Sequence, residues 1–139
     1  MKKFNSKEER SNFLLESNDN LKNLGKLKKS IIAETKQSHC NDFVKVYAIK
    51  KDNKIQDIKF ETNSCIITNV STDLFLSIIK DKNLDEITKL LSLYNDYVKN
   101  NIYSEKLKDI NVFENLIVNK RRISCLLVVY EVINKLITN

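Results

Sequence analysis

The sequence predicts an α+β protein in which a small three-stranded antiparallel sheet is followed by packed helices. Two observations indicate this fold class. Between residues 30 and 62, apolar and polar residues alternate and many side chains are β-branched or aromatic, which is typical of half-buried strands. After Ser64 the apolar residues recur every three or four positions instead, the spacing of one helix face. The C-terminal half is therefore expected to be helical.

The N-terminal segment is expected to contain one short helix and a loop. Ser6 and Glu9 have the spacing of a capping box, which predicts a helix that begins there and runs to about Ser17. Residues 18–29 are polar and include Gly25, the only glycine of the chain. This composition favours a loop that leads into the sheet.

Three strands account for the alternating segment. Lys51-Asp52-Asn53-Lys54 has the composition of a hairpin turn, and Ile58 with Phe60 should share the buried face of the return strand. The expected strands are residues 30–37, 42–51 and 54–62.

The helical half divides into three expected segments. The first helix follows Ser64, a candidate N-cap. The second begins where Asn83 and Glu86 have the spacing of a helix start. Residues 100–119 suggest a short helix inside a loop, and residues 123–137 form the last helix.

Composition and charge indicate which locations and partners to expect for the protein. The 139 residues suit a single domain, 1–139, and the net charge of +6 comes from lysines that are spread along the chain. No nucleic-acid-binding motif accompanies this charge, so no nucleic-acid partner is expected. No apolar run approaches the roughly 20 residues that span a bilayer, and residues 1–9 lack the apolar stretch of a signal peptide. We expect a cytoplasmic protein without a membrane partner.

Three cysteines lie near predicted element boundaries. Cys40 falls in the loop between two strands, Cys65 where the last strand passes into a helix, and Cys125 in the first turn of the last helix. The positive end of a helix stabilises a thiolate, which is the form that binds metal and carries sulfur. Disulfides are rare in the cytosol, so these cysteines are expected to be either buried apolar residues or a thiolate site.

Asp42 adds a possible fourth ligand. In an extended segment, residues two apart face the same side, so Asp42 and Cys40 can point at one centre. Three sulfurs and one carboxylate would suit a tetrahedral zinc ion or an iron site. His39, the only histidine, could be a ligand, a proton carrier or a bystander. By spacing alone, scattered cysteines are more often core residues than ligands, so both interpretations remain open.

Several short segments resemble motifs of the IscU/NifU-like iron–sulfur cluster scaffold family. Residues 38–42 (Ser-His-Cys-Asn-Asp) resemble its Cys-Gly-Asp loop, and 54–61 its hairpin return strand. Residues 64–72 resemble its second cysteine motif, 80–86 its Lys-Gly-Lys-Ser turn, and 122–125 its Arg-x-x-Cys motif. The gap between the last two cysteines is similar to that of the SufU branch. The chain departs from the family pattern at Asn41 and Ser64, which replace glycines, and at Asn69 and Val70, which replace small residues.

This resemblance implies a SufE/NifU-like fold and a site formed by Cys40, Asp42, Cys65 and Cys125. The site would hold Zn²⁺, iron or a transient [2Fe–2S] cluster. A cysteine desulfurase would supply sulfur, with Cys40 as the persulfide acceptor, and recipient apo iron–sulfur proteins would take the cluster. The role implied for Arg122 is structural or electrostatic, beside Cys125.

The sequence leaves three functions open. The chain could be a scaffold or carrier, which is not an enzyme, or a zinc-dependent sulfurtransferase that relays persulfide through Cys40. It could also be an interaction protein whose cysteines only fill the core.

Overall fold

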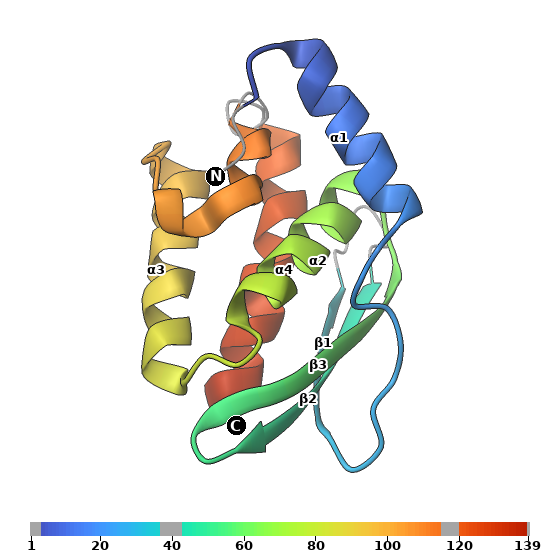
Figure 1. Cartoon of the computed structure of the whole chain (residues 1–139), viewed down its shortest axis with the longest axis vertical. Coiled ribbons are helices and arrows are strands. Elements are labelled where there is room, and N and C mark those ends of the chain that lie inside the picture. Colours follow the sequence, from blue (N-terminus) through green and yellow to red (C-terminus); the bar gives the residue numbers. More distant parts are fainter. Residues whose placement is uncertain (1–3, 37–42, 115–119, 139) are drawn as a thin grey trace.

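A computed structural model describes residues 4–36, 43–114 and 120–138 and confirms the α+β fold class. The three strands form one antiparallel sheet in the order β1-β2-β3. Helices α2 and α4 pack on one face of the sheet, and α3 packs against α4, farther from the sheet (Figure 1). In chain order the elements are α1 (Lys7–Asp19), β1 (Ile31–Lys36), β2 (Phe43–Lys51), β3 (Lys54–Asn63), α2 (Ile66–Ile79), α3 (Leu84–Asn100), the 3₁₀ helix η1 (Glu105–Phe113) and α4 (Lys120–Thr138).

The β2–β3 hairpin follows the predicted turn. Asp52 and Asn53 have φ angles of 54° and 64°, the left-handed conformation that two-residue hairpin loops require and that Asp and Asn tolerate well. The pairing register between β2 and β3 shifts between Ile49 and Lys50 of β2. As predicted, Ile58 and Phe60 of β3 are both fully buried against the helices.

The outer edge of β3 is occupied by loop backbone. The Phe60 N–H donates to the Asn23 carbonyl at 2.8 Å, and the Gly25 N–H donates to the Phe60 carbonyl at 2.9 Å. Near the other end of the strand, Ile55 exchanges backbone hydrogen bonds with the α2–α3 turn, through Asp81 and Lys82. Gly25 has a φ of +140°, a conformation that L side chains rarely adopt, which explains why glycine stands there.

The helix starts follow local capping rules. The Ser6 hydroxyl accepts from the Glu9 N–H at the start of α1, while the Glu9 carboxylate accepts from Asn5. Asn83 and Glu86 form a full capping box at the start of α3, as predicted. The segment after α3, expected to be a short helix inside a loop, contains η1, which is kinked at Lys108. Residues 115–119 of this segment lie outside the described part of the chain.

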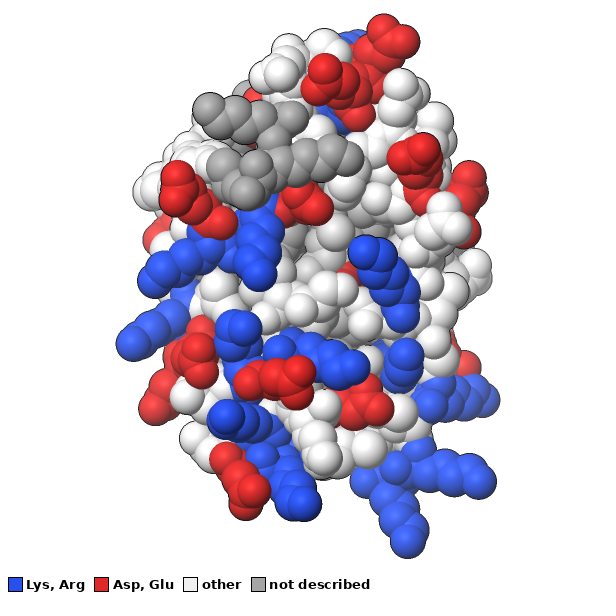
Figure 2. Space-filling view, viewed as in Figure 1, with Lys and Arg blue, Asp and Glu red and all other residues white. Residues whose placement is uncertain are grey.

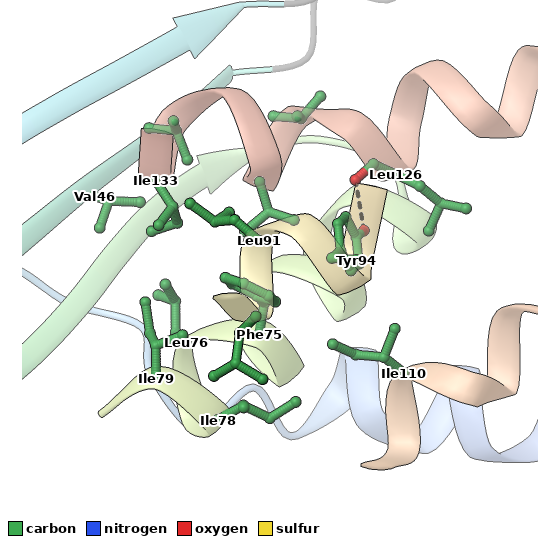
Figure 3. Close-up of a cluster of buried hydrophobic side chains, with 14 of the residues drawn as sticks. Val46, Phe75, Leu76, Ile78, Ile79, Leu91, Tyr94, Ile110, Leu126 and Ile133 are labelled. Atoms are coloured by element: carbon green, nitrogen blue, oxygen red, sulfur yellow. Dashed lines mark hydrogen bonds between the residues drawn. The ribbon is translucent and has the colours of Figure 1, made fainter. Parts of the chain in front are cut away.

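The core lies between the sheet and the helices. Figure 3 shows side chains from β2, α2, α3, η1 and α4 pointing into this region, with the Tyr94 hydroxyl donating to the Leu126 carbonyl at 2.6 Å. Helix α4 buries more of its surface than a single apolar stripe would suggest, because Val128, Val129 and Val132 are fully buried as well. A broad buried face fixes α4, and with it Cys125, against the other elements.

Candidate metal centre

Cys65 is the N-cap of α2, with extended backbone angles (φ −72°, ψ 167°). The prediction that Ser64 is the N-cap is therefore wrong by one residue. The Ser64 hydroxyl instead donates to the Phe43 carbonyl at 3.1 Å, which ties the end of β3 to the start of β2. Cys65 thus stands where the positive end of a helix attracts negative charge.

Cys125 lies deeper in α4 than the sequence suggested. The helix includes Lys120, so Cys125 is at least its sixth residue and lies beyond the first turn. Only 5% of its surface is exposed, and it belongs to the hydrophobic core. The unpaired N–H groups of a helix belong to its first four residues, so the argument that the helix end stabilises a Cys125 thiolate does not hold.

The fold nevertheless brings these two cysteines into contact. Although they are 60 positions apart in sequence, the Sγ atoms of Cys65 and Cys125 lie 3.7 Å from each other. This distance is well beyond a disulfide bond of about 2.05 Å. Two sulfurs bound tetrahedrally to one zinc ion lie about 3.8 Å apart, because each Zn–S bond is about 2.3 Å long. The observed distance between the two sulfurs is therefore the one that two ligands of a shared metal ion would have.

Thr68 joins the two cysteines and was missed by the sequence analysis. Its Oγ1 lies 3.6 Å from the Cys65 Sγ and 3.3 Å from the Cys125 carbonyl oxygen, to which it donates. The side chain is fully buried. Thr68 is three residues beyond Cys65, and residues at this spacing share a helix face, so its place beside Cys65 could have been predicted.

Asn69 links three segments around the site. Its amide nitrogen donates to Asn18 of α1 at 3.0 Å and to the Ser64 carbonyl at 3.3 Å. Its amide oxygen accepts from Thr62 of β3 at 2.8 Å. The larger side chain that replaces a small family residue therefore cross-links α1, β3 and the start of α2, which holds the Cys65 backbone in place.

Cys40, Asp42 and His39 lie outside the described residues, so their predicted roles stay predictions. The strands on either side of them are described. Lys36 at the end of β1 pairs with Phe43 at the start of β2, and Phe43 pairs with Asn63, two residues before Cys65. Within the described ranges, no group of three or more His, Cys, Asp or Glu side chains could hold a metal ion. A complete ligand set would therefore need residues from the β1–β2 connection.

A surface pocket of about 580 Å³ opens beside Cys65. Helix α1 contributes Leu15, which is 54% exposed, and α4 contributes Arg122, an exposed cation. The half-buried Cys65 can therefore be approached from solvent along a mainly apolar surface with a positive charge at its margin. The lining residues are Ser11, Leu14, Leu15, Cys65, Ile66, Ile67 and Arg122.

Asp73 is a buried carboxylate with a different role. It is 5% exposed and accepts from the backbone N–H groups of Lys22 and Asn23 at 2.8–3.1 Å and from the Asn23 side chain at 2.9 Å. These bonds anchor the loop after α1 to α2. Because its oxygens are already engaged, Asp73 is a structural residue rather than a spare metal ligand.

Comparison with protein families gives one match that covers most of the chain. Residues 9–139 match the family model described as the NifU-like N-terminal domain. Across the part of the chain that the structure describes, no helix has the length and apolar character needed to cross a bilayer.

Curated relatives and solved structures agree with this match. An iron–sulfur cluster assembly scaffold protein IscU from Thermotoga maritima is 25% identical over 107 residues, which cover 76% of this chain and 75% of the relative. A zinc-dependent sulfurtransferase SufU from Bacillus subtilis is 23% identical over 118 residues, with 84% and 80% covered.

Two crystal structures show the same fold. One is a scaffold protein for the SUF iron–sulfur system from Fervidobacterium islandicum, with a TM-score of 0.81 and 23% identity over 88% of this chain and 91% of that one. The other is the N-terminal part of a NifU-like protein from Brucella abortus, with a TM-score of 0.78 and 20% identity over 86% and 85%.

Proposed function

The chain belongs to the family of NifU-like N-terminal domains, and on that basis we propose that it is an iron–sulfur cluster assembly protein with one thiolate-rich site. In this proposal the site accepts sulfur from a cysteine desulfurase, holds iron or a nascent cluster as cargo, and passes it to apo iron–sulfur proteins. The proposed ligands are Cys40, Asp42, Cys65 and Cys125.

The observation that carries the proposal is the 3.7 Å separation of the Cys65 and Cys125 sulfurs. Two packed thiols also touch at this distance, but it is equally the spacing that two thiolate ligands of one metal ion require. Thiolates are the ligands that zinc and iron–sulfur centres prefer among protein side chains. The family match over residues 9–139 favours the metal site over cysteines that only fill the core.

Strand register supports the inclusion of Cys40 and Asp42. Asp42 is bonded to Phe43, whose carbonyl accepts from Ser64 next to Cys65. Cys40 precedes Phe43 by three residues, a length of chain that spans at most about 11 Å. The β1–β2 connection therefore ends at Phe43, which Ser64 ties to the segment just before Cys65, and Cys40 is three residues along the chain from that contact.

The proposed sulfur transfer uses this chain's thiol as a nucleophile. The Cys40 thiolate attacks the outer sulfur of a persulfide on the desulfurase. A new S–S bond forms on Cys40 as the donor S–S bond breaks, and the donor cysteine leaves as a thiolate, so no external oxidant or reductant is needed. The pocket beside Cys65 offers a route for the donor, and Arg122 at its margin attracts the anionic persulfide.

A zinc-dependent sulfurtransferase is the second candidate, and the sulfur spacing also favours it. The separation of 3.7 Å fits tetrahedral zinc, and Cys125 is 5% exposed, as suits a closed site. When bound, zinc would act as a Lewis acid that keeps its thiolate ligands deprotonated. Cys40, Asp42, Cys65 and Cys125 would hold it, Thr68 would orient Cys65, and Cys40 would also accept and release the sulfur.

Metal analysis separates the two candidates. Stoichiometric zinc in the purified protein without a coloured iron species would favour the sulfurtransferase. An iron–sulfur absorption band after anaerobic reconstitution would favour the scaffold. The variants Cys40→Ala, Cys65→Ala and Cys125→Ala should lose bound metal, whereas Asp52→Asn, an exposed turn substitution, should retain it. Unchanged metal content in all three cysteine variants would reject both candidates.

The sulfur step has its own test. The protein is mixed with a cysteine desulfurase and cysteine, and intact mass spectrometry then detects the gain of one sulfur atom. Wild type should acquire this mass and Cys40→Ala should not. Equal labelling of Cys40→Ala would show that another cysteine accepts the sulfur.

A further inference from the structure

A second hollow lies at the end of α2 that is remote from Cys65. It has a volume of about 340 Å³ and is bounded by the C-terminal end of α2, the first half of α3, and η1. Ile78 stands thirteen residues after Cys65, which corresponds to about 20 Å along a helix. The hollow is therefore separate from the candidate metal centre, and a molecule bound there would leave the Cys65 pocket open.

The floor of this hollow is apolar. Ile78 and Leu90 are each 7% exposed, and Leu93 is half-buried between them and solvent. These side chains come from α2 and α3, so the packing of the two helices fixes the shape of the floor. A rigid apolar floor of this size can take an aliphatic or aromatic side chain.

The rim of the hollow is cationic. It carries Lys82, Lys89, Lys106 and Lys108, from the α2–α3 turn, α3 and η1. Within the described ranges, none of these four ammonium groups has a carboxylate within 4.0 Å. Among the residues that the structure describes, Glu86 is the only acidic one that lines the hollow, and its Oε1 already accepts the Asn83 N–H in the capping box of α3. The rim therefore favours an anionic ligand.

Lys108 is held at the rim by a strained backbone. Its φ of 52° and ψ of −126° interrupt η1, and this conformation is costly for any residue with a side chain. The Asn111 amide donates to the Lys108 carbonyl at 2.9 Å and to the Ser104 carbonyl at 3.0 Å, which stabilises the kink. Backbone strain of this kind is concentrated at functional sites, so it independently marks the hollow as a place where geometry matters.

We propose that this hollow, defined by its floor (Ile78, Leu90, Leu93) and its four rim lysines, binds an acidic segment of a partner protein through an apolar side chain flanked by carboxylates. The floor would bury the apolar side chain, and the lysines would pair with the carboxylates on either side. This proposal does not depend on which metal the cysteines hold.

A nucleic acid fits this surface less well. Figure 2 shows Asp and Glu side chains interspersed among the lysines on this face, so no continuous basic stripe runs across it. A phosphate backbone needs such a stripe and gains nothing from an apolar floor. A short acidic segment with an apolar anchor needs only the local lysines and the floor.

The test uses synthetic peptides as probes. One short peptide alternates leucine with aspartate and glutamate, a second replaces the leucines with serine, and a third replaces the acids with lysine. Binding to the full chain is followed at low ionic strength by NMR shifts of the methyl groups of Ile78, Leu90 and Leu93. Only the acidic leucine peptide should shift all three, at concentrations up to about 1 mM.

Matched variants locate the binding. The double variant Lys89→Glu/Lys106→Glu should weaken binding of the acidic leucine peptide by about tenfold, as expected when two rim charges change from attraction to repulsion. The control Lys7→Glu/Lys51→Glu makes the same change in net charge at exposed positions outside the hollow and should bind as wild type does. Metal content should be the same in all of these proteins.

Three results would overturn the proposal. One is the absence of methyl shifts at the floor with the acidic leucine peptide. Another is tighter binding of a single-stranded oligothymidylate that the same double variant abolishes, which would make the hollow a nucleic-acid surface. Equal weakening by both double variants would also count against it, because the effect would then come from overall charge.

Discussion

Replacing Thr68 with valine should lower the free energy of unfolding more in the metal-loaded protein than in the metal-free protein. Valine has nearly the same shape as threonine, so Thr68→Val removes the hydroxyl and leaves the packing of this fully buried side chain almost intact. The hydroxyl makes two contacts, at 3.3 Å to the Cys125 carbonyl and at 3.6 Å to the Cys65 sulfur. Both are at the long end of the hydrogen-bond range, so each contributes modestly.

The expected magnitudes follow from these contacts. In the metal-free protein, the lost hydroxyl bond should cost about 1 kcal/mol, which lowers Tm by about 3 °C for a chain of this size. In the loaded protein, the Cys65 thiolate also loses the group that orients it. Loss of such a supporting contact lowers metal affinity by about 10- to 100-fold, which corresponds to about 1.4–2.7 kcal/mol.

Two measurements on the same samples separate these effects. Urea denaturation with and without zinc gives the loss of stability in each state, and competition with a chromophoric chelator gives the zinc Kd. Thr68→Ser is the matched control: it keeps the hydroxyl and loses a buried methyl group, so it should lose about 1 kcal/mol in both states while keeping its zinc affinity. If Thr68→Val loses the same stability with and without zinc, Thr68 only packs the core and the reasoning is refuted.

Three further substitutions test contacts that stabilise the fold. Asp73→Asn should lower the free energy of unfolding by about 2 kcal/mol in urea titrations, because the amide nitrogen that replaces one carboxylate oxygen cannot accept the Lys22 N–H. Asp52→Asn, in an exposed turn, should leave it unchanged. Burial raises the pKa of the Tyr94 phenol, so the fold binds this proton more tightly than the unfolded chain does. Wild type should therefore lose stability as pH rises above about 10, and Tyr94→Phe should lose less over that range in thermal melts. Gly25→Ala should lower the free energy of unfolding by about 1 kcal/mol in the same urea assay. The added methyl group has room, so the loss comes from the φ of +140°, which strains a residue with a side chain.

The sheet and most helix starts could be predicted because their signals are local. The turn at Asp52 and Asn53 needs two residues that tolerate left-handed φ, and the capping box of Asn83 and Glu86 depends on groups three residues apart. The kink at Lys108 could not be predicted in this way. Neither its neighbours nor its residue type favours that conformation, which is stabilised by the Asn111 side chain.

The candidate site was predictable only in part. Cys65 was expected at a helix start and lies there, because a strand end and a helix start meet at it. Its contact with Cys125 joins residues 60 positions apart, and only the packing of α2 on α4 creates it. Neither periodicity nor capping contains that information, so the resemblance to a known family supplied it. The parts assigned to Cys40 and Asp42 remain predictions.

The loop backbone along β3 also limits how copies of this chain can associate. Asn23 and Gly25 take up the hydrogen-bonding groups of Phe60, and the α2–α3 turn takes up those of Ile55. An edge whose groups are already paired cannot recruit a strand from another molecule. Strand addition at β3 would have to displace these loop contacts, so pairing of identical chains through their sheets is favoured at the edge of β1.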